Sequence, residues 1–146
     1  MSCNIKLLSA NCQGLGNIDK RRDVLNYFEQ LNCDIFCLQD THWTEKDCQK
    51  IKNYWPGEMI SNGFKSNSRG VAVLMKKTFE YSILDTFSDN SGNLLTVDLK
   101  TNEMTLKIIN IYAPSTDTPS FFQKVVDIID NNVLFFCFYT FLFAYH

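Results

Sequence analysis

A short apolar run, DIFCLQ at residues 34–39, constrains the fold of this chain more than any other segment. A strand with one face in water alternates polar and apolar residues, and this run does not alternate. It has the pattern of a strand that other parts of the chain cover on both faces. The fold must therefore supply apolar layers above and below this strand.

Apolar patterns in the rest of the sequence predict helices and strands in alternation, followed by a run of strands. Further strands are predicted over residues 5–11, 58–61, 71–75, 81–87, 94–99 and 104–112. Thr101 and Asn102 are expected to form the turn that joins the last two strands into a hairpin. This mixture of strands and helices indicates an α/β or α+β sandwich.

Three helices are predicted from capping residues and from apolar residues at helical spacing. Asp19 is expected to cap a helix that runs to about residue 31, with the basic residues 20–22 in its first turns. Thr44 is expected to cap a second helix, which ends before residue 55. A third helix is expected to follow Thr118 and Pro119 and to reach about residue 131. The apolar residues that it would bury are Phe122, Val125, Val126 and Ile129.

Composition bounds the size and the electrostatics of the fold. The chain has 146 residues, enough for one ordinary domain, and its 45% hydrophobic content is enough for a packed core. The formal net charge is −2 and the isoelectric point is about 5.6. Non-specific binding to nucleic acid usually needs a basic surface, so any binding of DNA must depend on a local patch.

The six cysteines do not form the pattern of a disulfide scaffold, because they are scattered and no C-x-x-C pair occurs. Cys12, Cys33 and Cys37 lie in or beside apolar segments, where a reduced cysteine behaves as a small hydrophobe. We expect buried free thiols rather than disulfides or zinc ligands. The first residues, MSCN, lack the apolar core of a signal peptide. An intracellular, reducing compartment is therefore expected, and secretion is not.

The C-terminal segment departs from the rest of the chain in composition. Residues 133–145, VLFFCFYTFLFAY, carry no charge and are rich in aromatic side chains. A membrane span needs about 20 apolar residues, so the run is short for one. A buried strand would account for its first few residues only. We interpret the run as a break in composition and not as a membrane anchor, which divides the chain into a domain over residues 1–132 and a divergent tail over residues 133–146.

Three predicted strands end in side chains that suit the cleavage of a phosphodiester. Asn11 closes the first strand, Asp40 follows the buried strand, and Tyr112 closes the last. Strand ends converge when their strands are neighbours. A carboxylate is a hard oxygen ligand for Mg²⁺, an asparagine amide can hold a carboxylate or a histidine in place, and a tyrosine hydroxyl can donate to a phosphate oxygen.

Six short motifs, taken in order, resemble the endonuclease/exonuclease/phosphatase superfamily. Within it they are most similar to the apurinic-type endonuclease domain of non-LTR retrotransposons. The resemblance runs from about residue 4 to residue 132 and is specific as an ordered set. The motifs are NCQGL at residues 11–15, KRR at 20–22, LQDTH at 38–42, SRGVAVL at 68–74, IYAP at 111–114 and FF at 121–122.

The resemblance implies a fold, an activity and a set of residue roles. The family folds as a four-layer α/β sandwich of the DNase-I-like type and nicks DNA with a divalent metal, Mg²⁺ or Mn²⁺. Asp40 is the expected metal ligand, Asn11 is the active-site amide and a second expected metal ligand, and Tyr112 is the phosphate contact. Arg69 and Thr41 are the expected contacts to DNA.

Expected partners and location follow from the same resemblance. DNA would be the substrate, a reverse transcriptase domain would accompany the endonuclease in the intact element protein, and a functional product would act in the nucleus. No membrane partner is expected. His42 is a candidate general base, but the family places its acid–base histidine elsewhere.

Two departures from the family pattern lower the expected activity. Asp40 stands where the family has glutamate. The aspartate side chain is one C–C bond shorter, so its carboxylate is withdrawn by about 1.5 Å. Mg²⁺ holds its ligands at about 2.1 Å in strict geometry, so weaker metal binding is expected. The family's G-D-x-N stretch, just after the strand that here begins at Val133, and its C-terminal aspartate–histidine pair have no counterpart. We expect an endonuclease domain cut short before the second half of its fold, with weak or no activity.

Two other functions stay open. The chain can be a non-catalytic remnant or a weak nucleic-acid-binding module, because half of the expected site is missing. It can also be a phosphatase of the same superfamily that acts on lipid or inositol phosphates. The LQDTH and SRGVAVL motifs favour the endonuclease over the phosphatase.

Overall fold

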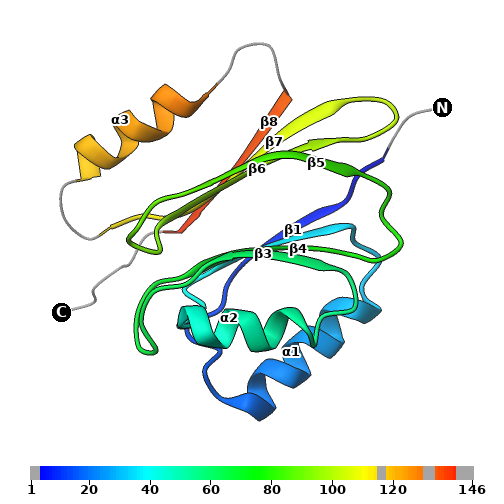
Figure 1. Cartoon of the computed structure of the whole chain (residues 1–146), viewed down its shortest axis with the longest axis vertical. Helices are drawn as coiled ribbons and strands as arrows, with labels where there is room; N and C mark the ends of the chain where they lie inside the picture. The colour runs from blue at the N-terminus through cyan, green and yellow to red at the C-terminus, as the bar shows by residue number, and fades with distance from the viewer. Residues whose placement is uncertain (1–3, 115–117, 130–133, 141–146) are drawn as a thin grey trace.

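Two four-stranded sheets lie face to face in the computed structural model, which describes residues 4–114, 118–129 and 134–140 (Figure 1). The first sheet has the strand order β1-β2-β4-β3, with bounds Leu7–Asn11, Ile35–Gln39, Val71–Met75 and Glu58–Asn62. The second has the order β5-β6-β7-β8, with bounds Ser82–Ser88, Leu94–Lys100, Thr105–Tyr112 and Leu134–Thr140. The β1–β2 and β7–β8 pairs are parallel, and the other pairs are antiparallel.

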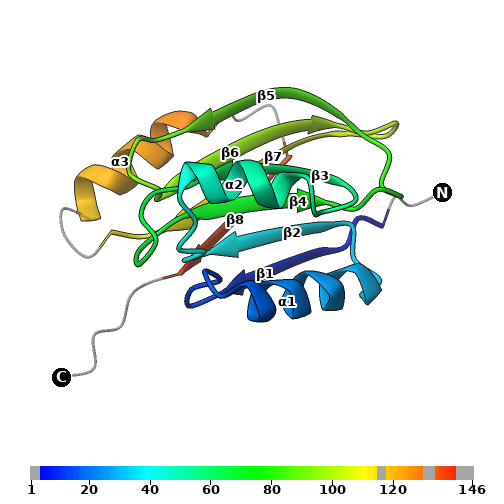
Figure 2. The ribbon, with the colours of Figure 1, turned by 60° about the horizontal axis from the view of Figure 1, so that its bottom comes forward.

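Helices cover the outer faces of both sheets. α1 (Ile18–Gln30) and α2 (Glu45–Lys52) lie on the outer side of the first sheet, and α3 (Thr118–Ile128) lies on the outer side of the second (Figure 1). Figure 2 shows the stack from another side, with β2 between β1 and β4. The order of layers is helix, sheet, sheet, helix, which confirms the expected four-layer α/β sandwich.

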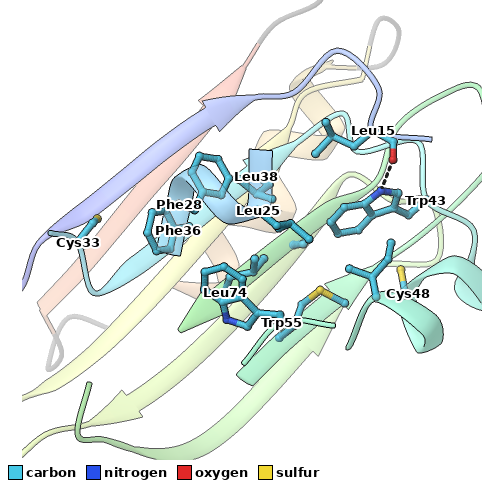
Figure 3. Close-up of a cluster of buried hydrophobic side chains, with 13 residues drawn as sticks. Leu15, Leu25, Phe28, Cys33, Phe36, Leu38, Trp43, Cys48, Trp55 and Leu74 are labelled. Atoms are coloured by element: carbon cyan, nitrogen blue, oxygen red, sulfur yellow. Dashed lines mark hydrogen bonds between the residues drawn. The ribbon is translucent and has the colours of Figure 1, made fainter. Parts of the chain in front are cut away.

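A separate apolar core fills each gap between the layers. The core between the first sheet and its helices is rich in large side chains, among them Phe28, Phe36, Trp43 and Trp55 (Figure 3). The core between the two sheets is built from β2, β4, β6 and β7. In the third core, Phe121 and Val125 of α3 pack on Leu94, Ile109 and Ile111 of the second sheet.

β2 is covered on both faces, as its apolar pattern predicts. Phe36 and Leu38 point toward α1 and α2, and Ile35 and Cys37 point toward the second sheet. All five residues of the strand are buried. Because side chains alternate along a strand, Gln39 shares the face of Ile35 and Cys37 and therefore points between the sheets.

The structure corrects the predicted start of the first helix. Asn17 caps α1, because its side-chain oxygen accepts a hydrogen bond from the backbone N–H of Lys20 at 2.9 Å. Asp19 lies instead in the first turn, where its carboxylate pairs with Arg22 at 3.1 Å. A negative charge there also favours the positive end of the helix dipole. Asn and Asp are equally good caps, so the sequence pattern did not separate these two positions.

Thr44 caps α2 as predicted. Its hydroxyl accepts from the backbone N–H of Asp47 at 3.1 Å, and the Asp47 carboxylate accepts from the backbone N–H of Thr44 at 3.0 Å. This reciprocal capping box satisfies two N–H groups that the helix itself leaves unpaired. The cap fixes the point at which the chain that follows β2 turns into a helix.

α3 buries a different stripe from the one predicted. Phe121 and Val125 are buried, and Phe122 and Ile129 are partly buried, but Val126 is 58% exposed. The prediction for Val126 was wrong because the apolar residues of this helix span more than one face, and the contact with the sheet selects between them. No helix within the described residues is long and apolar enough to cross a membrane.

Seven residues of the uncharged C-terminal run form β8. Its backbone pairs in parallel with β7, in register from Leu106 opposite Leu134 to Tyr112 opposite Thr140. Residue 133 and residues 141–146 lie outside the described residues. The predicted division of the chain at residue 132 stays a prediction.

A buried amide pair joins the two sheets. Nε2 of Gln39, at the end of β2, donates to Oδ1 of Asn110 in β7 at 2.9 Å. Nδ2 of Asn110 donates to the carbonyl oxygens of Leu38 and Ala72 at 3.0 and 2.9 Å. Asn110 has no exposed surface, so water cannot replace these bonds. The pair fixes the end of β2 against β7.

Four cysteines whose side chains the structure describes are free thiols, as predicted: Cys12, Cys33, Cys37 and Cys48. Burial raises the pKa of the Cys12 thiol to about 12 from its ordinary value of 9.0, and the nearby Lys20 ammonium opposes part of that rise. Burial also raises the pKa of the other three thiols. These side chains therefore act as small apolar residues of the fold.

Native Cys12 is expected to react with iodoacetamide at pH 8 at least about 100-fold more slowly than in the urea-unfolded chain, because the thiolate is the nucleophile. Peptide mass spectrometry after timed alkylation measures both rates. Equal rates in the two states would contradict the burial of this thiol.

Candidate active site

A pocket of about 490 Å³ opens where β2 and β7 end, beside the loop between β3 and β4. The residues that line it come from segments far apart in the sequence: Asp40, His42, Phe64, Lys65, Asn67, Ser68, Arg69, Asn93, Tyr112, Ala113 and Pro114. Two of the three predicted strand-end residues, Asp40 and Tyr112, therefore meet at one pocket, and Arg69 joins them.

Asp40 follows β2 directly and is 8% exposed. Its backbone φ is +56°, a left-handed conformation that aspartate adopts more readily than most residues. Oδ1 accepts hydrogen bonds from Nε2 of His42 at 2.8 Å and from the backbone N–H of Arg69 at 3.2 Å. Oδ2 accepts none from any residue that the structure describes. One carboxylate oxygen is held in place, and the other is available to a ligand.

His42 also has a left-handed backbone, with a φ of +58°. Its backbone N–H donates to the carbonyl oxygen of Arg69 at 2.8 Å. This bond fixes the segment that follows Asp40 against the residues just before β4. The imidazole lines the same pocket as the carboxylate that it contacts. His42 is therefore part of the site, where its imidazole contacts the Asp40 carboxylate.

Tyr112 ends β7 and is 6% exposed. Its backbone N–H donates to the carbonyl oxygen of Asn93 at 2.8 Å, and its own carbonyl oxygen accepts from Nδ2 of Asn93 at 2.6 Å. Burial and the nearby Asp40 carboxylate raise the pKa of the Tyr112 phenol, and Arg69 lowers it in part. The phenol therefore stays protonated at neutral pH and can donate a hydrogen bond into the pocket.

The Arg69 guanidinium is held over the ring of Phe64, with Cζ at 4.7 Å from the ring centroid. Its Nη1 donates to the carbonyl oxygen of Ser91 at 3.3 Å. The Lys65 ammonium lies 5.2 Å from the centroid of the same ring. Two cations at the pocket make a local basic patch on a chain whose net charge is −2.

The structure does not bring Asn11 or Thr41 to the pocket wall. Asn11 is exposed at the end of β1, and its Oδ1 accepts from the backbone N–H of Gln13 at 3.0 Å. In the β1–β2 register it lies opposite Gln39, next to Asp40 but on the neighbouring strand. Thr41 is only 1% exposed, and its side chain faces the backbone of Gly70.

Sequence patterns did not single out three residues that shape this site: Phe64, Asn93 and Asn110. Phe64 braces Arg69, Asn93 fixes the end of β7, and Asn110 ties β7 to β2. Asn110 did leave a signal, because it is a polar residue inside the apolar strand β7. No local pattern marks Phe64 or Asn93, whose roles depend on contacts with distant segments.

The donors at the pocket fit a hard divalent cation with few protein ligands. Mg²⁺ commonly takes one or two carboxylates, keeps several waters and completes its shell with substrate phosphate oxygens. Asp40 supplies one such oxygen through Oδ2. Within the described ranges, no group of three or more His, Cys, Asp or Glu side chains gathers to hold a metal. A cation here would therefore be held by Asp40, water and phosphate, and Asn11 is not placed as a second ligand.

Known proteins resemble this chain in sequence. The profile of the Endonuclease/Exonuclease/phosphatase family matches residues 8–132. A curated relative from Xenopus laevis, the transposon TX1 uncharacterized 149 kDa protein, is 28% identical over 127 residues. That match covers 86% of this chain and 10% of the relative, so the chain spans about a tenth of the relative's length.

Solved structures share the fold. The endonuclease domain of TRAS1, a telomere-specific non-LTR retrotransposon, superimposes with a TM-score of 0.58 at 11% identity, over 86% of this chain and 52% of that one. The AP endonuclease LMAP from Leishmania major superimposes with a TM-score of 0.59 at 18% identity, over 82% of this chain and 43% of that one. This chain therefore spans about half the length of both.

Proposed function

The chain belongs to the endonuclease/exonuclease/phosphatase family, and from that premise we propose that it acts as a metal-dependent DNA endonuclease domain of a retrotransposon. The proposed cofactor is Mg²⁺ or Mn²⁺, and the proposed substrate is the DNA backbone. The transposon origin of the TX1 relative and the retrotransposon origin of the TRAS1 domain support this choice. A reverse transcriptase domain as partner and action in the nucleus belong to the same proposal.

One observation carries the proposal: a carboxylate, a phenol and a guanidinium meet at a single pocket. A phosphodiester brings negatively charged oxygens, which the guanidinium of Arg69 would attract. The protonated phenol of Tyr112 can donate a hydrogen bond to one of these oxygens. Oδ2 of Asp40 can bind a cation that also binds another oxygen of the phosphate.

The bound metal would polarise the phosphate and lower the pKa of a coordinated water. Asp40 would hold the cation, Arg69 would orient the phosphate, and Tyr112 would donate toward the oxygen on which negative charge develops. Asp40 is the single acidic residue among the described residues that line the pocket. We therefore propose that cleavage by this chain is slow and depends strongly on the metal concentration.

A plasmid assay tests the proposal. Purified chain is incubated with supercoiled plasmid in Mg²⁺ or Mn²⁺, with EDTA as the control. Conversion of the plasmid to the open circular form in the presence of metal, and not in EDTA, supports an endonuclease. No nicking at any metal concentration would overturn the proposal for this chain, and salt-sensitive binding to DNA would then favour a non-catalytic binding module.

A phosphatase that acts on lipid or inositol phosphates is the second candidate, because the pocket chemistry suits any phosphate ester. Release of inorganic phosphate from inositol phosphates, measured without plasmid nicking, would favour it. The two basic side chains beside Asp40 suit the charged backbone of a nucleic acid, so we rank the endonuclease first.

Tyr112→Phe is expected to lower the maximal nicking rate by about 100-fold, because removal of one donor to a developing oxyanion costs about 100- to 1,000-fold. The fold should persist, since Asn93 contacts only the backbone of Tyr112. Single-turnover rates at saturating DNA measure the effect. An unchanged rate would remove Tyr112 from the proposed mechanism.

A further inference from the structure

Asp40 and His42 form a contact that a regular strand could not produce so closely. The two residues are separated by Thr41, and both have left-handed backbones, with φ of +56° and +58°. This geometry brings Nε2 of His42 to 2.8 Å from Oδ1 of Asp40. A carboxylate can only accept, so Nε2 must carry the proton that forms this bond.

The other edge of the imidazole fits against a glycine. A Cβ added to Gly14 would lie 2.5 Å from Nδ1 of His42, closer than real Cβ atoms approach other atoms, and 3.0 Å from its Cε1. Gly14 has a φ of +87°, which also favours glycine. The ring therefore lies in a slot between Gly14 and Asp40.

The glycine loop that forms this slot is itself tied down. The backbone N–H of Gly14 donates to the carbonyl oxygen of Asp40 at 2.8 Å, and that of Leu15 donates to the carbonyl oxygen of Thr41 at 2.8 Å. The Lys20 ammonium donates to the carbonyl oxygen of Gly14 at 2.9 Å. The slot is therefore a fixed wall of the site.

We propose that His42 is a positioning residue that holds the Asp40 carboxylate in one orientation, and that Gly14 provides the room for its ring. Nε2 of His42 is engaged by Asp40, and Nδ1 faces Gly14. The use of the held carboxylate as a metal ligand rests on the proposed function.

Loss of the imidazole would release the carboxylate. Oδ1 would keep one hydrogen bond, the longer one from the backbone N–H of Arg69 at 3.2 Å. The terminal torsion of an aspartate is broad, so Oδ2 would no longer have a fixed direction. Loss of a residue that orients a metal ligand lowers metal affinity by about 10- to 100-fold in other sites.

Mn²⁺ binding, followed through the electron paramagnetic resonance signal of free Mn²⁺, tests the proposal without an activity measurement. His42→Ala is expected to weaken binding by about 10- to 100-fold. His42→Gln, whose side-chain amide can still donate, should restore affinity to within about threefold of the wild type. An Ala variant with unchanged affinity, or a Gln variant as weak as the Ala variant, would overturn the proposal.

The glycine loop provides a matched pair of variants. Gly14→Ala is expected to weaken Mn²⁺ binding as much as His42→Ala, because the new Cβ displaces the ring. Gly16→Ala makes the same change two residues later, where the nearest atom to the new Cβ is 4.0 Å away, and should leave binding unchanged. Adding Gly14→Ala to His42→Ala should have no further effect, since the two act through one contact. An additive double variant would contradict the slot.

Long-range proton–nitrogen NMR spectra test the His42–Asp40 contact when no metal is present. The proton on Nε2 of His42 is expected to exchange slowly with water in the wild type and to exchange faster in Asp40→Ala. An Nε2 proton that exchanges equally fast in both proteins would overturn the contact. A wild type that shows the protected proton but binds no Mn²⁺ would refute the proposed metal site and leave the positioning contact standing.

Discussion

Asp40→Asn is expected to lower the rate of metal-dependent DNA nicking by at least about 100-fold, because the metal contributes several kcal/mol to catalysis and each 1.4 kcal/mol is about tenfold in rate. The variant keeps an oxygen that can accept from His42 and from the backbone N–H of Arg69. The amide nitrogen then takes the place of Oδ2, and a neutral donor cannot bind a cation.

The substitution therefore separates the metal from the fold. Thermal melting of Asp40→Asn should stay close to that of the wild type, because both hydrogen bonds to the side chain persist. Asp19→Asn is the matched control, since Asp19 is a 78% exposed carboxylate on α1 that contacts Arg22 and does not line the pocket. Nicking by Asp40→Asn at the wild-type rate would show that Asp40 is not the metal ligand.

The layers of the fold could be predicted because they depend on local patterns. The apolar run at residues 34–39 predicts a strand buried on both faces, and β2 has that environment. Its neighbours in the sheet could not be read from the run itself. Side chains that are far apart in sequence decide the pairing, and the local apolar pattern does not reveal the register of β2 with β1 and β4.

The positions of the candidate site residues could be predicted only in part, and their roles stay predictions. Asp40 and Tyr112 meet because their strands end at one edge of the sandwich, as the strand-end argument requires. Asn11 also ends a strand, but its side chain accepts from the backbone two residues later. Such local bonds are common for asparagine at turns, and they compete with longer contacts. A strand-end position predicts proximity, and it does not predict side-chain direction.

The contacts of His42 could not be predicted from its spacing alone. Its proximity to Asp40 in sequence is visible, but the orientation of its ring depends on Gly14, which is 28 residues away, and on the backbone of Arg69. Three residues around the carboxylate, Asp40, His42 and Arg69, have left-handed backbones. Strained conformations of this kind persist where the surrounding structure holds them, and they gather at functional sites.

Asn110→Ala is expected to lower the free energy of unfolding by about 3 kcal/mol, since a buried partner left without its hydrogen bond costs about 1–3 kcal/mol. Nδ2 of Asn110 donates to two carbonyl oxygens, and its Oδ1 accepts from Gln39. Gln39 keeps other acceptors, Ser9 Oγ at 3.0 Å and the Cys37 carbonyl oxygen at 3.2 Å, which limits the loss. Urea unfolding measures the change.

Asn102→Ala is the control for Asn110→Ala, because Asn102 is exposed in the turn between β6 and β7 and should change stability by less than about 0.5 kcal/mol. Gln39→Ala combined with Asn110→Ala should cost less than the sum of the two, since both remove the same bond at 2.9 Å. Strict additivity would show that the amide pair does not couple the sheets.

The coupling matters for the site because Gln39 precedes Asp40 directly and Asn110 lies two residues before Tyr112. A loosened pair should therefore weaken Mn²⁺ binding as well as stability.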